Sequence, residues 1–311
     1  MNGALRQIPS LLGYFARRGP RHRNDASAAR SHNWSRTGSA LAPGLELQWL
    51  GTSGFCLAYE KHRILIDPYL TRAPLGDVLR RRVTAPSRDL ARRFVPGRVD
   101  AILIGHTHFD HALDAPEIAE RDGCRVYGSR SMANLMRLYG QAERAVEVEV
   151  YRTYGIGPFE VTFVPSVHSK LVLGLRVPYD HDITCEHFDE LMPSAYGCGQ
   201  VYGIHISVGG VTLYHQGSAD LLDDAIQHRG VDYFLCGIAG RGFTQDYAAR
   251  ILPRLQPRVV VPHHYDDFFR PLDAPMSFSL NVNFGAFVDE VRAVSSEFGL
   301  QSLDPLQSVG D

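Results

Sequence analysis

The stretch Ile102-Leu-Ile-Gly-His106-Thr-His108-Phe-Asp110-His111 contains three histidines and an aspartate within six residues. It completes an apolar run that predicts a buried strand, and loops at strand ends often carry function on a rigid scaffold. The spacing places His106 and His108 on one side of an extended turn and directs Asp110 and His111 elsewhere. Imidazole and carboxylate are ligands that zinc and related divalent cations accept. The stretch therefore predicts a site for two adjacent cations.

Composition indicates an ordinary globular protein, since 44% of the 311 residues are hydrophobic and 21% are charged. The net charge of −2 is unevenly distributed. Residues 1–44 carry seven arginines and one aspartate, a surplus of six positive charges, so the rest of the chain carries −8. An acidic body argues against a nucleic-acid partner, because proteins that bind nucleic acids usually present a basic face.

Cysteine content and hydropathy point to a cytoplasmic protein. The five cysteines are odd in number and form no C-x-x-C motif, which suits a reducing compartment. No apolar run approaches the roughly 18 residues of a membrane-spanning helix.

The N-terminal residues 1–18 have apolar side chains at near-helical spacing among arginines. Such a basic amphipathic segment suits peripheral contact with an anionic membrane. The alternative, which we favour, is a helix packed on its own domain or on a second subunit of a homo-oligomer.

Two parts of the chain differ in composition. Residues 1–44 consist of this amphipathic segment and, from Arg21 to Gly44, a linker or wrapping arm rich in Ser, Ala, Asn and Arg. From Leu45 onward, short alternating runs separated by Gly-containing turns predict antiparallel strands. Strand, helix and strand signals around residues 99–128 predict parallel pairing. We therefore expect a folded domain of the α/β class over residues 45–311.

Other predicted strands also end in side chains that bind metals. His168 follows an apolar strand at Pro165-Ser-Val, and His263 and His264 follow the strand Arg258 to Val261. Asp220 comes shortly after a further strand, in the sequence Gly217-Ser-Ala-Asp. A single histidine at a strand end is more often structural, so these positions depend on the first cluster for their interpretation.

The H-x-H-x-D-H pattern resembles the signature of the metallo-β-lactamase superfamily. The resemblance implies a four-layer αβ/βα sandwich with two mixed β-sheets and two bound divalent cations. It implies that His106, His108 and His168 hold one cation, and that Asp110, His111 and His264 hold the other. Zinc is the expected metal, with manganese and iron as alternatives. Asp110 and His264 are also our candidates for catalytic residues.

Three further acidic positions follow from the resemblance. Asp220 corresponds to an aspartate shared by the two cations, although many members carry it directly after the glycine, where this chain has Ser218. Either Asp220 makes the bridge or the bridge is missing. Asp67, after Ile64-Leu-Ile, corresponds to an aspartate that orients the ligands without binding metal. Asp266 could support His264 or make up for a missing bridge.

Substrate contacts are expected from loops around the cations. Arg81 lies in the segment 72–98, which holds eight arginines and two aspartates, and Arg241 is flanked by glycines. Arginine suits phosphate through its planar fork of donors. His187 and Tyr196 lie in the irregular insertion 178–200, which is long enough to be a substrate-facing lid. Alternatively, the consecutive arginines Arg80, Arg81 and Arg82 form a solvated face of a helix.

Motif order over about residues 45–285 is closest to the branch that contains N-acyl-phosphatidylethanolamine phospholipase D and ascorbate-phosphate lactonase. We therefore predict a hydrolase that uses metal-activated hydroxide on a phosphodiester, either a small molecule or a lipid. One alternative is a lactonase or other carboxylic ester hydrolase on the same metals. Another is a degenerate, non-catalytic binding scaffold, which Ser218 makes conceivable.

Overall fold

The computed structural model describes residues 15–38, 40–171, 175–187 and 190–310. Seven strands form the first sheet: Leu45–Trp49 (β1), Phe55–Tyr59 (β2), His62–Ile66 (β3), Ala101–Leu103 (β4), Arg125–Gly128 (β5), Ala145–Glu147 (β6) and Ser308–Val309 (β14). Their order is β14-β1-β2-β3-β4-β5-β6. Neighbours from β14 to β3 pair antiparallel, whereas β3, β4, β5 and β6 pair parallel.

The second sheet repeats this plan. Its strands are Thr153–Ile156 (β7), Phe159–Ser166 (β8), Val201–Val208 (β9), Val211–Gln216 (β10), Tyr233–Gly237 (β11), Val259–His263 (β12) and Gly299–Leu300 (β13). Strands β7 to β10 pair antiparallel and β10 to β13 pair parallel. The prediction of two mixed sheets is confirmed.

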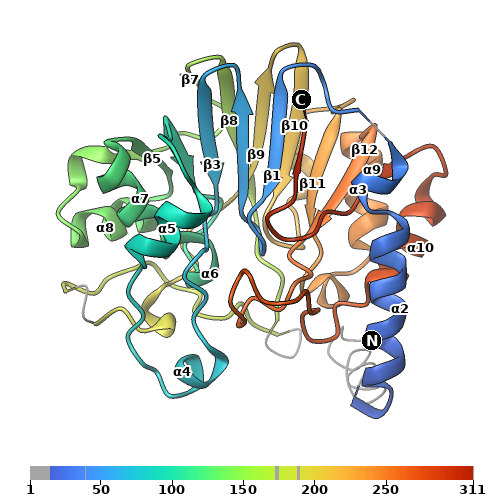
Figure 1. Ribbon diagram of the computed structural model, residues 1–311. Helices are drawn as coiled ribbons and strands as arrows, with labels where there is room; N and C mark the ends of the chain where they lie inside the picture. The colour runs from blue at the N-terminus through green and yellow to red at the C-terminus, as the bar shows by residue number, and fades with distance from the viewer. Residues whose placement is uncertain (1–14, 39, 172–174, 188–189, 311) are drawn as a thin grey trace.

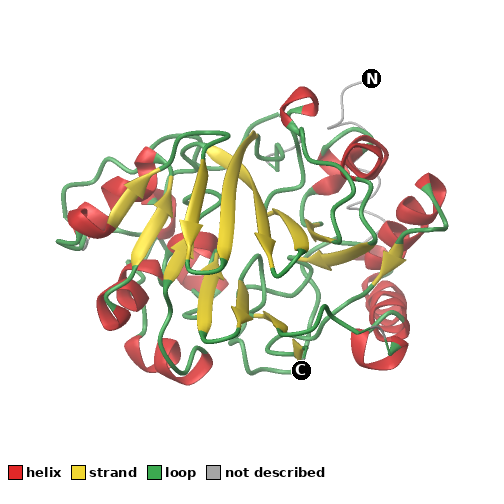
Figure 2. Cartoon of the chain, turned by 90° about the horizontal axis from the view of Figure 1, so that it is seen from above, coloured by secondary structure: helices red, strands yellow, loops and turns green. Residues whose placement is uncertain are grey.

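Helices cover the outer faces of both sheets (Figure 1). On the first sheet lie α5 (Arg88–Phe94), α7 (Ala115–Asp122) and α8 (Arg130–Leu138), and on the second lie α9 (Tyr247–Leu255), α10 (Phe284–Val294) and α2 (Arg18–Ser31). Shorter helices and 3₁₀ turns are α3 (Trp34–Thr37), α4 (Leu75–Leu79), α6 (Phe109–Ala112), η1 (Ala142–Arg144), η3 (Pro193–Ala195), η4 (Asp223–Ala225) and η5 (Arg241–Phe243). Figure 2 shows the strands in the middle with helices on both flanks. The arrangement is the four-layer sandwich that the sequence predicts.

The larger apolar core lies between the sheets. Alternating burial along β1, in which Leu45, Leu47 and Trp49 are buried, directs one face of the first sheet inward. Phe163 and Ile204 of the second sheet belong to the same cluster. A second cluster fills the space between the first sheet and its helices. These two cores fix the strand ends, because a shift in register would move buried side chains to the opposite face.

The chain before β1 differs from the expected linker. Residues 18–31 form α2, which packs on α10 with the carboxylate of Asp25 accepting a hydrogen bond from the backbone N–H of Gly285, at 3.2 Å. The ring of His22 contacts that of Phe278, with 5.4 Å between centroids. Ala and Arg are good helix formers, and the tertiary contacts stabilise a helix that lacks an apolar stripe of its own. Residues 1–14, which contain most of the amphipathic segment, lie outside the described residues, and the domain boundary at Leu45 stays a prediction.

A histidine of β9, His205, and a histidine of the loop before β11, His228, stack on one another and predict a loss of stability in mild acid. The rings of His205 and His228 lie 3.8 Å apart at 14°. Burial, and then the neighbouring His228, lower the pKa of His205 from 6.5 to about 4. The uncharged ring is therefore favoured in the folded state, and its contribution is complete above pH 6.5 and lost as the pH falls toward 4.

We expect His205→Gln to weaken the pH dependence of unfolding in this range, as measured by the denaturant midpoint between pH 7 and pH 4.5. The wild type serves as the reference, because all other titrating groups are common to both proteins. Equal slopes for the two proteins would contradict the assignment.

Candidate metal centre

Three loops bring the predicted ligands together at one end of the sandwich. The turn from β4 into α6 supplies His106, His108, Asp110 and His111, the end of β8 leads to His168, and β12 leads to His264. We define the first triad as His106, His108 and His168, and the second triad as Asp110, His111 and His264. Within each triad, one ligand atom from each residue lies within 4.8 Å of the others. The ligands expected from the sequence are thus brought together, apart from Asp220.

The first triad presents imidazole nitrogens whose orientation is fixed from behind. Nε2 of His108 lies 2.8 Å from the carbonyl oxygen of Pro178, which can only accept, so Nε2 holds the proton and Nδ1 faces inward. That Nδ1 is 3.1 Å from Nε2 of His106. Nδ1 of His168 donates to the carbonyl oxygen of Ser169 at 2.7 Å, which leaves its Nε2 unprotonated. Nδ1 of His108 and Nε2 of His168 therefore carry lone pairs that are available to bind a cation.

The second triad contains the only carboxylate among the six ligands. Oδ2 of Asp110 lies 3.3 Å from Nε2 of His264 and 3.9 Å from Nε2 of His111. The rings of His106 and His111 are 3.8 Å apart between centroids, so the two triads are direct neighbours. This adjacency suits two cations acting on one substrate group.

Burial keeps the first triad uncharged at neutral pH. Loss of hydration lowers the pKa of His108 to about 4, although Asp110 opposes the shift. Burial, followed by repulsion from neighbouring imidazoles, holds the pKa of His106 and of His168 well below the ordinary value. Metal binding requires unprotonated imidazole, so these histidines need not lose a proton to bind a cation at pH 7.

In the second triad, charged neighbours outweigh burial and favour the charged forms of Asp110 and His111. Burial opposes ionisation of Asp110, but the imidazoles of His111 and His264 outweigh it and lower the pKa of the carboxyl group. Burial likewise disfavours a charged His111, yet the carboxylates of Asp67 and Asp110 raise its pKa. A cation must therefore compete with a proton for Nε2 of His111.

Asp67 supports the second triad from the end of β3. Its Oδ2 accepts from Nδ1 of His111 at 2.8 Å, and its Oδ1 accepts from the backbone N–H of Gly105 at 2.7 Å. A Cβ on Gly105 would lie 3.2 Å from Oδ2 of Asp67, which explains the glycine before the histidine cluster. Asp67 and His264 both have positive φ, at 43° and 60°. Such strained backbone conformations in residues with side chains are concentrated at functional sites.

Asp266 supports His264 through a neighbouring loop. One carboxylate oxygen accepts from the backbone N–H of Thr52 at 2.8 Å, and the other pairs with Arg72 at 2.8 Å. The carbonyl oxygen of Thr52 in turn accepts from the backbone N–H of His264 at 2.8 Å. Asp266 therefore fixes the backbone of a ligand and does not itself join the triads.

The residues present fit a pair of divalent cations. The atoms that converge are Nε2 of His106 and the unprotonated Nδ1 of His108, 3.1 Å apart, and Nε2 of His264 and Oδ2 of Asp110, 3.3 Å apart. Lone pairs that converge in a buried site repel one another unless a cation lies between them. Five imidazoles and one carboxylate form a donor set that suits zinc and related metals.

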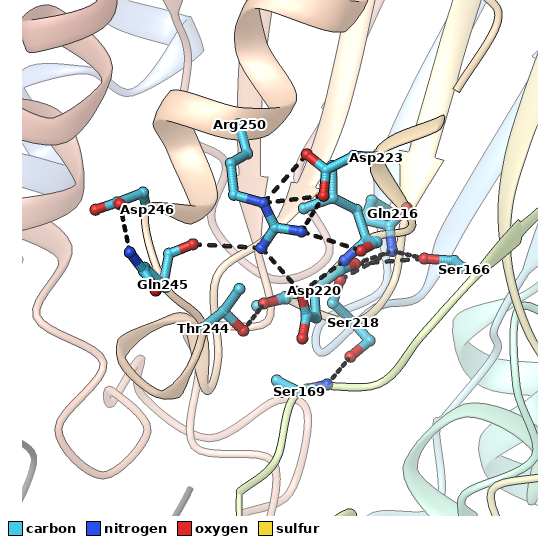
Figure 3. Close-up of polar contacts among 12 residues, drawn as sticks. Ser166, Ser169, Gln216, Ser218, Asp220, Asp223, Thr244, Gln245, Asp246 and Arg250 are labelled. Atoms are coloured by element: carbon cyan, nitrogen blue, oxygen red, sulfur yellow. Dashed lines mark hydrogen bonds and ion pairs between the residues drawn. The ribbon is translucent and has the colours of Figure 1, made fainter. Parts of the chain in front are cut away.

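Asp220 lies outside both triads, contrary to the expected bridge. The chain after β10 turns so that the Asp220 carboxylate accepts from the backbone N–H of Leu221 at 2.9 Å and pairs with Arg250 of α9 at 3.4 Å. Figure 3 shows Asp220 beside Arg250 and Asp223. The side chain is thus committed to holding α9 and belongs to neither triad.

Arg241 is also committed elsewhere and does not act as the expected anion contact. Its side chain, 7% exposed, pairs with Glu290 of α10 at 2.9 Å and donates to the carbonyl oxygens of Val282 and Asn283. The guanidinium also lies over the ring of Phe287, 5.4 Å from its centroid. The flanking glycines leave room for this buried arrangement, so Arg241 fastens α10 to the loop after β11.

We expect Arg241→Met to lower the free energy of unfolding by about 2 kcal/mol, because it leaves two buried carbonyl groups without a donor. The KM for an anionic substrate should stay within twofold of the wild-type value. Chemical denaturation and steady-state kinetics measure the two quantities. A tenfold higher KM with unchanged stability would instead support the prediction that Arg241 contacts an anionic substrate.

The other predicted substrate contacts lie in different environments. Tyr196 is fully buried in the core beneath the first sheet's helices, and burial raises its pKa, so it packs the insertion and does not face a substrate. His187 is exposed on the same insertion. Arg81 is exposed just after α4 and agrees with the solvated-face alternative. Substrate contact by His187 or Arg81 stays a prediction.

Sequence reasoning missed the layer behind the ligands. His263 is buried and stacks on His215, with centroids 4.9 Å apart, whereas His264 joins the second triad. Pro178 and Ser169 contribute only their carbonyl oxygens, and Arg72 contributes its pairing with Asp266. Backbone groups leave no residue-type signal, and Arg72 was one arginine among eight in its segment.

Comparison with known proteins agrees with this geometry. A family model described as the beta-lactamase superfamily domain matches residues 62–265. A UPF0173 metal-dependent hydrolase of Carboxydothermus hydrogenoformans is 29% identical over 255 residues, which cover 80% of this chain and 93% of the relative. A UPF0173 metal-dependent hydrolase of Anaeromyxobacter sp. (strain K) is 30% identical over 235 residues, which cover 72% and 75% of the two chains.

The fold is similar to that of Igni18, a metallo hydrolase from the archaeon Ignicoccus hospitalis. The two structures align with a TM-score of 0.57 at 19% identity, over 85% of this chain and 97% of the other. At this identity the likeness concerns the fold alone.

Proposed function

Because the chain belongs to the metallo-β-lactamase superfamily and is a metal-dependent hydrolase, we propose that it cleaves a phosphodiester at two divalent cations held by its two triads. Zinc is the proposed metal, since imidazole-rich sites suit it, and the same donors accept manganese or iron.

The observation that supports a phosphodiester is the charge of the ligand set. Among the six ligands only Asp110 is negative, and the imidazoles of the first triad are neutral at pH 7. Two divalent cations would therefore retain excess positive charge in a buried site. An anionic diester offsets that charge as it binds, whereas a neutral lactone does not.

Bound cations would supply an activated water and stabilise charge at the attacked centre. The chain's own residues fix the geometry. Pro178 and Ser169 set the ring orientation of two histidines in the first triad, and Asp67 sets that of His111. Asp110 and His264, whose Oδ2 and Nε2 lie 3.3 Å apart, are the proposed catalytic pair because both would hold the same cation.

Metal depletion and a substrate comparison test this proposal. The protein dialysed against a chelator should lose activity on bis(p-nitrophenyl) phosphate and regain it with zinc or manganese. We expect a higher kcat/KM on this diester than on a chromogenic lactone. A preference for the lactone would establish the carboxylic ester alternative, and reconstituted protein without activity on either class would contradict the proposed substrate.

A lipid diester is the form of substrate that the molecular surface favours. Leu75 and Leu79 lie one helical turn apart on α4 and are 47% and 74% exposed, and the neighbouring Arg80 and Arg81 are exposed as well. Figure 1 shows α4 projecting at the end of the molecule where β3 leads toward Asp67. Exposed apolar groups beside arginines suit an anionic membrane surface. Among the described residues, no helix has the length and apolarity needed to cross a bilayer.

Sedimentation with vesicles tests this surface. The wild type should bind vesicles that contain phosphatidylglycerol more strongly than vesicles of phosphatidylcholine alone. Leu79→Ser should weaken binding while leaving the turnover of bis(p-nitrophenyl) phosphate unchanged. Equal sedimentation of the variant and the wild type would show that α4 does not bind the membrane and would favour a small-molecule diester.

A further inference from the structure

His168 is the member of the first triad that comes from the second sheet, and its position depends on the loop after β8. Its Nδ1 donates to the carbonyl oxygen of the next residue, Ser169, at 2.7 Å. The backbone N–H of Ser169 in turn donates to Oγ of Ser218 at 3.0 Å. Figure 3 shows this contact, with the Ser218 side chain pointing to Ser169. One hydroxyl group thus holds the backbone of Ser169, the residue whose carbonyl oxygen orients the histidine.

Ser218 is itself held rigidly. Ser218 is 4% exposed. Its carbonyl oxygen lies 3.1 Å from Nε2 of Gln216, which is the last residue of β10. The same Nε2 lies 2.8 Å from Oγ of Ser166 and 2.9 Å from the carbonyl oxygen of Asp220. Gln216 therefore links the end of β8 to the loop after β10.

The far side of this network is anchored to α9. Arg250 pairs with Asp220 at 3.4 Å and with Asp223, and Thr244 donates to the carbonyl oxygen of Ala219 at 2.6 Å. The residues around Ser218 are thereby fixed on both sides (Figure 3). A hydroxyl in such a frame keeps one geometry, which is what a support for a metal ligand requires.

The structure assigns Ser218 as a positioning residue for His168, acting through the Ser169 peptide and thereby setting the affinity of the first triad for its cation. This assignment rests on the proposed metal site but not on the proposed substrate. The residue contacts no ligand atom directly, so its effect should appear in metal binding at one triad only. Supports of this kind typically change metal affinity by about 10- to 100-fold.

The test isolates each triad in a double-mutant design. His264→Ala disables the second triad and His108→Ala disables the first, and cobalt(II) is titrated into each protein after metal removal while its visible absorption is recorded. Adding Ser218→Ala should weaken cobalt binding about 10- to 100-fold in the His264→Ala protein and leave it unchanged in the His108→Ala protein. Ser218→Thr, which retains the hydroxyl, should preserve affinity.

Ser207→Ala, at a half-buried serine of β9, is the matched control, and thermal unfolding of the metal-free proteins verifies that each variant folds. Equal affinities with and without Ser218→Ala in the His264→Ala protein would overturn the assignment, as would equal losses in both backgrounds. Failure of the His264→Ala protein to bind cobalt would overturn it together with the first metal site. Because the readout is metal binding, inactivity on phosphodiesters would contradict the proposed substrate and leave this inference standing.

Discussion

The variant His108→Ala should lose at least about 100-fold in kcat/KM on bis(p-nitrophenyl) phosphate while retaining its fold. Replacing a residue that merely supports a ligand costs roughly 10- to 100-fold, so the loss of a ligand itself should cost more. His108 presents Nδ1 to the first triad, and its Nε2 contact with Pro178 is a single hydrogen bond in a loop. Elemental analysis of the purified variant should show about one metal ion fewer per chain than the wild type.

His62→Ala is the control for this prediction. His62 is a partly exposed histidine on β3, and its Nδ1 lies 3.2 Å from a carboxylate oxygen of Asp100. It belongs to neither triad. It should change neither activity nor metal content. Circular dichroism should show the wild-type fold for both variants. Full activity of His108→Ala would refute hydrolysis at this centre.

The second large effect is expected for Asp67→Asn. Asp67 accepts two hydrogen bonds, one from Nδ1 of His111 and one from the N–H of Gly105, through its two oxygens. An asparagine offers only one acceptor oxygen, so either the histidine or the backbone donor meets an NH₂ group. Misorientation of His111 should lower metal affinity at the second triad and kcat/KM by about 10- to 100-fold.

Asp100 provides a closely matched control, because its carboxylate also lies beside a histidine Nδ1 and accepts from a backbone N–H. The partners are His62, at 3.2 Å, and Arg63, at 2.9 Å, on a partly exposed surface. Asp100→Asn should leave metal content and turnover unchanged. A loss of activity in both variants would show that the effect concerns folding, and no loss in Asp67→Asn would remove Asp67 from the site.

Much of the centre could be predicted because its ligands follow strands. An apolar run that ends in clustered histidines has a recognisable pattern, and the carboxyl ends of neighbouring strands meet at one edge of a sheet. The resemblance to the metallo-β-lactamase superfamily then implied the six ligands and the supporting role of Asp67, and the structure brings these residues together. The sandwich and its two mixed sheets were implied by the same resemblance.

The residues that were misplaced share a different property, since their environment depends on long-range packing. Arg241 looked accessible between two glycines, yet Glu290 and the Phe287 ring from α10 enclose it. Asp220 looked available as a bridge, but Arg250 of α9 binds its carboxylate. Their partners lie on separate helices whose docking no local pattern reveals. Tyr196 resembles them, because a mixed-polarity insertion gives no sign of which aromatic ring turns inward.

The turn after β4 and the first residues of α6 supply two members of each triad from one short piece of backbone. An insertion or deletion there would displace both metal positions together, so natural variation should avoid the segment 105–111. The loops 68–98 and 178–200 carry none of the six ligands. Apart from Arg72, which pairs with Asp266, and Pro178, whose carbonyl oxygen orients His108, they can diverge in length and chemistry. Transplanting those loops between relatives, with the turn left intact, is therefore the direct route to an enzyme of altered selectivity.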